Sequence, residues 1–208
     1  MKKENNVLFV GGHPDDVELG CGGTLSKHLA VGDNVFVLVM TNGENGNHTP
    51  DKKECFTSMK KLGVKNVFFA NIPDGYLQDD YATVNLIEEH IKKFKINRVY
   101  THSPIDRHQD HRHCSLAVSS AARRILDIFL FEGPSTNPGF DPHYFIELSE
   151  SDLKKKLSAL SSYKTQIEKG VVNLNYIEQL AGIRGVKGNT TYAEAFALNH
   201  MTRRGKDV

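Results

Sequence analysis

Two short clusters of histidine and aspartate carry the side chains in this sequence that are best suited to chemistry. The first, Gly12–Asp16, reads GHPDD and follows the apolar run Val7–Val10. The second, Asp106–His111, reads DRHQDH and follows another strand-like run, Arg98–Thr101. Catalytic zinc sites commonly use three imidazole or carboxylate ligands and leave one position for water. Together the clusters predict one metal-dependent active site.

The elements around these clusters must bring them together. Strands are expected at residues 7–10, 34–40, 66–70 and 98–101, and helices at 16–30, 52–62 and 82–94. This alternation predicts an α/β, Rossmann-like fold in which a mostly parallel sheet has helices on both faces, a three-layer sandwich. Such sheets bind ligands at the carboxyl ends of their strands. Both clusters fall at that edge.

The second half of the chain is less regular. The breaker-rich stretch GPSTNPG at 133–139 predicts a loop, and we expect residues 131–142 to form a flexible loop or lid. A strand is expected within 140–148, and helices at 150–161 and 176–183. With 208 residues the chain can bury a substantial core, so we predict a single domain over residues 1–208.

The amino-acid composition indicates which classes of binding partner the protein is suited to. The 26 Lys and Arg nearly balance the 25 Asp and Glu, so charge favours a small-molecule substrate over nucleic acid. No run reaches the roughly 18 apolar residues of a membrane span. Cys21, Cys55 and Cys114 form no CxxC pair, which favours reduced thiols packed as small hydrophobes. We expect a cytoplasmic protein. The sequence leaves open whether it forms a homo-oligomer.

Structural interpretations compete with the chemical ones. Pro14 and the two aspartates after it suit the entry to a helix, and residues 106–112 suit a solvated turn. Gly20–Gly23 lacks the order of a phosphate-binding loop, so close helix packing is the preferred interpretation. Glu18 and Glu194 could support the site, or could be a first-turn charge and a buried group satisfied by backbone.

Several motifs together carry a resemblance. They are His13–Asp16 followed by Gly22–Thr24, Pro73–Gly75, His108–His111, residues 156–166 and Tyr192–Phe196. In these motifs the chain resembles the LmbE-like family of zinc-dependent de-N-acetylases, which includes the N-acetylglucosaminylphosphatidylinositol deacetylases. Two positions depart from the family: Gln109 stands where proline is usual, and 51–54 lacks an arginine that often contacts substrate.

The resemblance implies a role for each residue of the two clusters. Its metal ligands would be His13, Asp16 and His111, and its catalytic residues would be Asp15, His108 and Asp110. One Zn²⁺ is expected, although the same ligands suit Fe²⁺. Asp15 would be the general base for metal-bound water, His108 the acid or the cationic group near the oxyanion, and Asp110 the residue that orients His108. The proton for the leaving amine could come from either His108 or Asp15.

The implied activity is removal of the N-acetyl group from an N-acetylglucosamine-type sugar or glycoconjugate. Two other classes stay open, because a fold alone does not settle function. One is a different metal-dependent amidase or a phosphoesterase, and the other is a non-catalytic sugar-binding protein. Pairing of Asp15 with His108 favours an enzyme.

Overall fold

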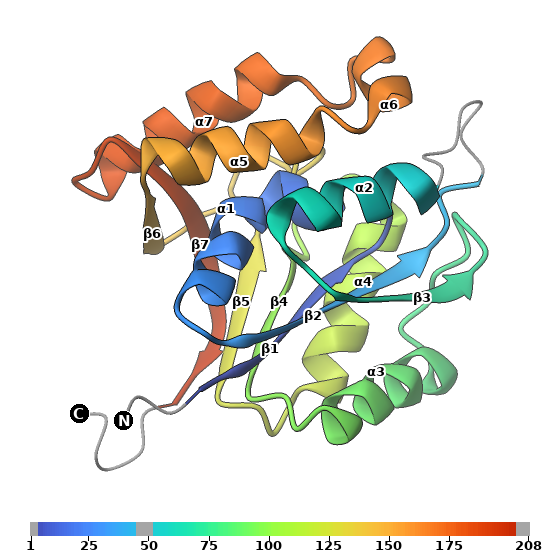
Figure 1. The fold of residues 1–208 in the computed structure, drawn as a ribbon. Coiled ribbons are helices and arrows are strands. Elements are labelled where there is room, and N and C mark those ends of the chain that lie inside the picture. The colour runs from blue at the N-terminus through green and yellow to red at the C-terminus, as the bar shows by residue number, and fades with distance from the viewer. Residues whose placement is uncertain (1–3, 45–51, 203–208) are drawn as a thin grey trace.

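The computed structural model describes residues 4–44 and 52–202. Within these residues, seven strands form one sheet in the order β3-β2-β1-β4-β5-β7-β6 (Figure 1). The strands are β1 (Asn6–Gly11), β2 (Asn34–Thr41), β3 (Asn66–Ile72), β4 (Arg98–His102), β5 (Asp127–Phe131), β6 (Tyr144–Leu148) and β7 (Tyr192–Met201). Strands β1 to β5 run parallel, and β7 runs antiparallel to both of its neighbours.

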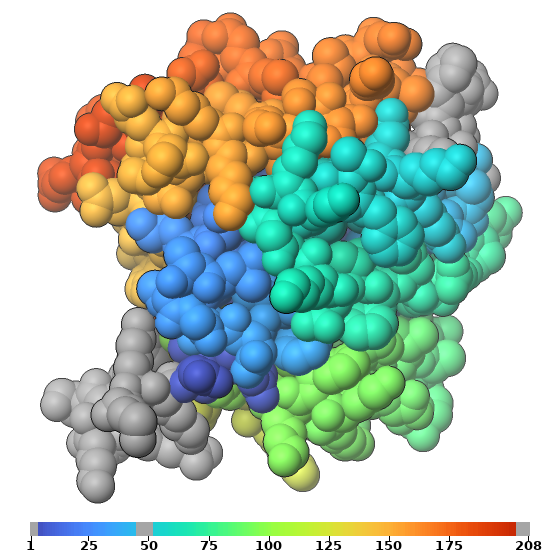
Figure 2. Space-filling view, in the orientation of Figure 1, coloured from blue at the N-terminus to red at the C-terminus, as the bar shows by residue number. Residues whose placement is uncertain are grey.

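Helices cover both faces of the sheet. One face carries α1 (Asp16–Ala30), α2 (Lys52–Leu62), α5 (Glu150–Leu160), α6 (Lys164–Glu168) and α7 (Leu174–Lys187), and the other carries α3 (Tyr81–Lys93) and α4 (Gln109–Ala121) (Figure 1). In the space-filling view, α1, α2 and α5 pack side by side over the first face (Figure 2). The predicted three-layer α/β architecture is confirmed.

The predicted elements of the first half match the structure to within two residues, because each is a long apolar run or a clear helical repeat. Two strands, β5 and β7, were not expected from the sequence. β7 inserts antiparallel between β5 and β6 and buries Glu194 among its apolar residues, which hides the usual strand pattern. The helix expected at 176–183 is longer, Leu174–Lys187, and the strand within 140–148 is shorter.

The loop expected at 131–142 begins after Phe131, the last residue of β5. Its backbone is hydrogen-bonded to the segment that precedes α4: Asn137 N donates to Ile105 O at 3.0 Å, and Arg107 N donates to Ser135 O at 3.1 Å. Movement of this loop as a lid stays a prediction. Residues 45–51, which follow β2, lie outside the described part of the chain.

The order of the strands places the two clusters beside each other. β1 pairs with β2 on one side and with β4 on the other, so the chain reverses its direction of winding between β1 and β4. In open α/β sheets ligands bind at such a switch point, outside the carboxyl ends of the strands. β1 leads into Gly12–Asp16, and β4 leads into Asp106–His111.

Gly20 and Gly23 of α1 serve close packing, as interpreted from the sequence. A Cβ on Gly20 would lie 2.2 Å from the Phe131 ring, and one on Gly23 would lie 2.7 Å from Leu148. The cysteines are all buried in the two core clusters. Among the described residues, no helix combines the length and apolar character that crossing a bilayer requires.

Candidate metal centre and active site

His13, Asp15 and Asp16 lie in the turn from β1 into α1. The backbone N–H of His13 donates to Asp16 Oδ2 at 2.6 Å, which holds the Asp16 carboxylate against the turn. Asp15 is the N-cap of α1 with φ 90° and ψ −28°, and its side chain makes no capping hydrogen bond. A non-glycine residue in the left-handed region costs roughly 1 to 3 kcal/mol. The strained conformation of this turn therefore lowers stability, and it leaves the buried Asp15 carboxylate free of the helix backbone.

His111 comes from the first turn of α4 and meets the β1 turn across the end of the sheet. Its Nε2 lies 3.2 Å from His13 Nδ1 and 3.3 Å from Asp16 Oδ1, and His13 Nδ1 lies 3.3 Å from Asp16 Oδ2. Ligands about 2.0–2.2 Å from a tetrahedral ion stand roughly 3.4 Å apart, which is close to these separations. Different oxygens of Asp16 face the two histidines. Among the described residues, the groups whose single ligand atoms all lie within 4.8 Å of one another are His13, His108 and His111; Asp16, His102 and His111; and His13, Asp74 and Asp110. His13, Asp16 and His111 thus belong to one cluster of side chains suited to hold a cation.

The charges around these imidazoles also favour a cation. Burial opposes protonation of His111, but Asp16 and Asp106 outweigh it and raise its pKa to about 9. Burial likewise opposes protonation of His13, whose pKa is nevertheless raised by Asp110, Asp16 and Asp74. Carboxylates that stabilise two extra protons at this point would equally stabilise a divalent ion, which displaces such protons when it binds.

A second set of groups orients the two imidazoles. Asp106 Oδ1 and Ser135 Oγ each lie 3.2 Å from His111 Nδ1, and Ser135 Oγ donates to Asp106 Oδ1 at 2.7 Å. Asp74 Oδ1 lies 3.0 Å from His13 Nε2. Carboxylates behind a ligating imidazole fix its tautomer and its orientation. Sequence reasoning did not assign roles to Asp74 or Asp106, although both lie inside motifs that it quoted.

The role of Asp110 in orienting His108 stays a prediction, and the contacts of its carboxylate are with other groups. Asp110 is fully buried, and its Oδ2 contacts His13 Nε2 at 3.2 Å and accepts from Gly75 N at 2.7 Å. His108 is the N-cap of α4, and its Nδ1 accepts from the backbone N–H of Asp110 at 3.2 Å. In the first turn of the helix the carboxylate points back toward β1, so it meets the His13 ring instead.

His102, the last residue of β4, also joins the cluster and was missed. Its Nε2 lies 3.1 Å from Asp16 Oδ2 and accepts from Gly12 N at 3.0 Å, and its ring stacks on His111 with centroids 4.0 Å apart. Burial and the neighbouring His111 charge lower the pKa of His102 to about 4. The only signal in the sequence is its place at the end of a predicted strand.

Asp15 lies among buried acidic groups. Burial raises its pKa well above the ordinary value, and the charges of Asp16 and Glu18 raise it further. Glu18 accepts a hydrogen bond from Tyr163 Oη at 2.6 Å. Burial raises the pKa of Glu18 to about 7 despite this bond. The first turn of α1 therefore holds two carboxyls that gain protons easily.

A cleft of about 530 Å³ lies at the carboxyl edge of the sheet. Its lining includes the predicted ligands His13, Asp16 and His111, together with Asp15, His108, Ser135 and Lys169. The short helix α6, which leads to Lys169, is held by Glu54, whose carboxylate accepts from Lys164 N and Thr165 Oγ1, each at 3.2 Å. The volume is ordinary for a small-molecule site.

The comparison with known proteins agrees with this geometry. Residues 8–122, more than half of the chain, match the PIG-L family, described as GlcNAc-PI de-N-acetylase. The chain belongs to the PIG-L family. The matched range contains every residue that the sequence assigned to the metal and catalytic sets, and the family is one of deacetylases.

Individual proteins are similar to this chain beyond residues 8–122, the range that the family model matches. The PIG-L chain is 34% identical over 172 residues to the uncharacterized deacetylase YaiS of Escherichia coli, covering 78% of this chain and 92% of YaiS. It is 26% identical to diacetylchitobiose deacetylase of Thermococcus kodakarensis, over 90% of this chain and 80% of that protein. The solved structure of the conserved protein TT1542 from Thermus thermophilus superposes with a TM-score of 0.84 at 25% identity, covering 97% of each chain.

Proposed function

We propose that this deacetylase-family protein uses a metal ion to remove the N-acetyl group from an N-acetylglucosamine-type sugar or glycoconjugate. One observation carries the proposal: His111 Nε2 lies 3.2 Å from His13 Nδ1, an Asp16 oxygen lies 3.3 Å from each of these two nitrogens, and all three residues line one cleft with Asp15. A non-catalytic sugar-binding protein would have no use for a strained, buried carboxylate beside a metal-ligand set.

Zinc is the ion proposed for these ligands, with Fe²⁺ as the alternative that the same donors suit. When bound, the ion would polarise the acetamide carbonyl and make water acidic near neutral pH. Asp106 holds His111, and Asp110 and Asp74 hold His13. These carboxylates keep the ligand imidazoles aimed at one point.

Asp15 is the proposed general base. Its carboxylate takes a proton from the attacking water as the water oxygen forms a bond to the acetamide carbon. Burial and the charges of Asp16 and Glu18 raise the pKa of Asp15, which makes its carboxylate a stronger base for this transfer. Collapse of the tetrahedral intermediate breaks the C–N bond and releases acetate and the amine.

His108 is proposed as a hydrogen-bond donor to the oxyanion. Its Nδ1 accepts from the Asp110 backbone N–H, so a neutral His108 carries its proton on Nε2. Burial and the nearby His13 and His111 charges lower its pKa, which favours this neutral form. A neutral imidazole stabilises the oxyanion without giving up its proton. The proton for the leaving amine is therefore assigned to Asp15.

The substrate class rests on the cleft and on the relatives. A cleft of about 530 Å³ has room for an amino sugar carrying one further group. Diacetylchitobiose, the substrate in the name of the Thermococcus relative, is such a compound and is the first substrate to test. Other N-acetylglucosaminides with different aglycones complete the panel.

The test measures acetate and free amine released from this panel by purified protein. We expect activity that a chelator abolishes and that Zn²⁺ restores, with Fe²⁺ reconstituted in parallel to identify the better ion. Phosphate release from phosphate esters in place of acetate would favour the phosphoesterase alternative, and saturable sugar binding without turnover would favour the binding protein. Either result would overturn the proposal.

Two variants separate metal binding from catalysis. Asp15→Ala should keep its metal and lose about 100- to 10,000-fold in kcat, the usual contribution of a general base. His13→Ala should lose the metal itself, as metal analysis of the purified variant would show. An active Asp15→Ala enzyme would refute the assigned base.

A further inference from the structure

Helix α1 is not one continuous helix. Cys21 has φ −152° and ψ 25°, which breaks the hydrogen-bonding pattern and divides α1 into a short first segment, Asp16–Gly20, and a longer second segment, Gly22–Ala30. The first segment carries Asp16 and begins at Asp15. A helical segment of five residues is too short to be stable by itself, so other contacts must hold it.

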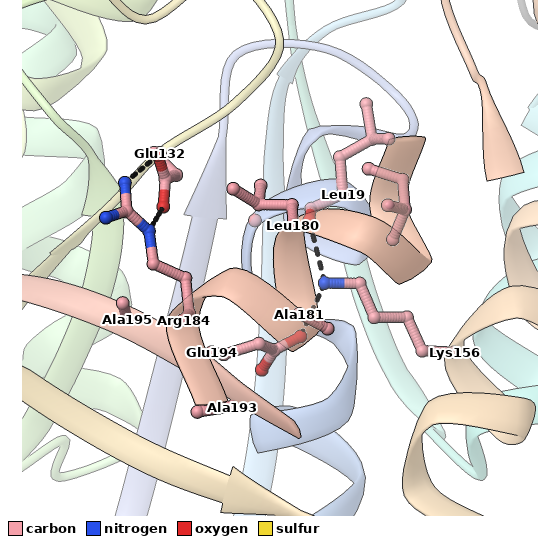
Figure 3. A pocket seen from close by; sticks show the side chains of 11 residues that line it. Leu19, Glu132, Lys156, Leu180, Ala181, Arg184, Ala193, Glu194 and Ala195 are labelled. Atoms are coloured by element: carbon pink, nitrogen blue, oxygen red, sulfur yellow. Dashed lines mark hydrogen bonds and ion pairs between the residues drawn. The ribbon is translucent and has the colours of Figure 1, made fainter. Parts of the chain in front are cut away.

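Two side chains from the C-terminal half of the chain meet at this break (Figure 3). Glu194 of β7 accepts from Gly23 N at 2.9 Å through Oε1 and from Thr24 N at 2.6 Å through Oε2. It therefore caps the start of the second segment. Lys156 of α5 donates from Nζ to Leu19 O at 2.9 Å and thereby satisfies a carbonyl at the end of the first segment.

The two capping side chains are joined to each other. Lys156 Nζ lies 2.6 Å from Glu194 Oε1, and the side chains are only 4% and 3% exposed. Both border a cavity of about 20 Å³, room for about one water molecule (Figure 3). Burial of two charges is costly unless each is paired and hydrogen-bonded. Here each charge is paired with the other and also hydrogen-bonds backbone groups beside the break in α1.

We propose that Lys156 and Glu194 form a clamp that positions Asp15 and Asp16 for catalysis by bridging the break in α1. The path is short: Lys156 holds Leu19 O, and Leu19 N donates to Asp15 O at 2.8 Å. One turn of helix thus links the clamp to the general base. This inference rests on the proposed function for its kinetic readout.

The clamp lies outside the residues that match the family. The match ends at residue 122, whereas Lys156 and Glu194 belong to α5 and β7. It gives a role to one residue in each of two motifs singled out in the sequence, residues 156–166 and Tyr192–Phe196. At Gly23, where Leu148 already leaves no room for a side chain, a Cβ would also lie 3.2 Å from Glu194 Oε1.

The test compares Lys156→Met with Asp127→Asn. Asp127 forms a largely buried ion pair with Arg98, with Nη2 and Oδ2 2.6 Å apart, at the opposite edge of the sheet from the cleft. Both variants remove one partner of an ion pair, but only the first reaches α1. We expect Lys156→Met to lower kcat about 100-fold with KM within twofold, since small misplacements of reacting groups have effects of this size. Asp127→Asn should keep kcat within twofold.

A double variant keeps the test decisive if Lys156→Met folds poorly. Lys156→Met with Glu194→Gln leaves no isolated buried charge, so its melting temperature should recover toward the wild type. Its kcat should stay low, because Leu19 O still lacks its partner. Recovery of kcat in step with stability, or a kcat that follows the folded fraction across all variants, would overturn the clamp.

Hydrogen exchange provides a readout independent of activity. Amides within residues 16–25 should exchange at least tenfold faster in Lys156→Met than in wild type or Asp127→Asn. If the wild type proves to have no deacetylase activity, the proposed function fails and exchange alone decides the clamp. Unchanged exchange in this stretch would overturn it.

Discussion

Glu18 offers a measurement of the electrostatics beneath the active site. It is 1% exposed in the first segment of α1 and accepts a hydrogen bond from Tyr163 Oη. Burial raises its pKa from an ordinary value of 4.5 to about 7, with the Asp16 charge acting in the same direction. Replacement Glu18→Gln keeps an oxygen for the Tyr163 hydrogen bond and removes the titration.

The direction in which stability changes with pH depends on whether the folded or the unfolded chain binds the Glu18 proton more tightly. The folded state holds the Glu18 proton up to pH of about 7, whereas the unfolded chain releases it near 4.5. The stabilising effect of this proton is fully present below pH 4.5 and is lost as the pH rises through about 7. The difference between the two pKa values corresponds to a contribution of roughly 3 kcal/mol to the free energy of unfolding. About 2.5 kcal/mol of this contribution is lost between pH 5 and 8.

Urea unfolding of metal-free wild type and Glu18→Gln at pH 5 and pH 8 tests this magnitude. The free energy of unfolding of the variant, relative to that of the wild type, should be about 2.5 kcal/mol higher at pH 8 than at pH 5. Because the Asp15 carboxyl interacts with Glu18, the same pair in an Asp15→Asn background serves as control. A stability difference that stays constant between pH 5 and 8 would refute the reasoning that burial raises this pKa.

Three further predictions follow from single contacts. Asp106→Asn should weaken zinc affinity about 10- to 100-fold in a chelator competition, because it removes the carboxylate behind His111, and unchanged affinity would count against that role. His108→Ala should retain zinc but lose about 100- to 1,000-fold in kcat, and a normal kcat would exclude it as oxyanion donor. Gly20→Ala should lower the free energy of unfolding by about 1 to 3 kcal/mol. Gly182→Ala, in an open helical position, should raise it by up to about 1 kcal/mol, and similar urea curves for the two variants would contradict the packing argument.

The placement of the predicted metal ligands was accessible from sequence because parallel strands bring their ends together. His13 and Asp16 follow β1, His111 follows β4, and these two strands are neighbours. Asp74 and His102 were missed because each is a single polar residue, and only the three-dimensional arrangement shows that it faces an imidazole or carboxylate. Contacts of this kind leave no periodic pattern in the sequence.

The sequence by itself determined the alternation of strands and helices, the three-layer fold and the meeting of the two clusters, because local propensity and hydrophobic pattern act over neighbouring residues. Tertiary structure alone decided which groups face each other. It turned Asp110 toward His13 and placed Lys156 against Glu194 across the break in α1. Side-chain direction depends on packing between elements distant in the chain, and a buried charge takes the partner that the packed core offers.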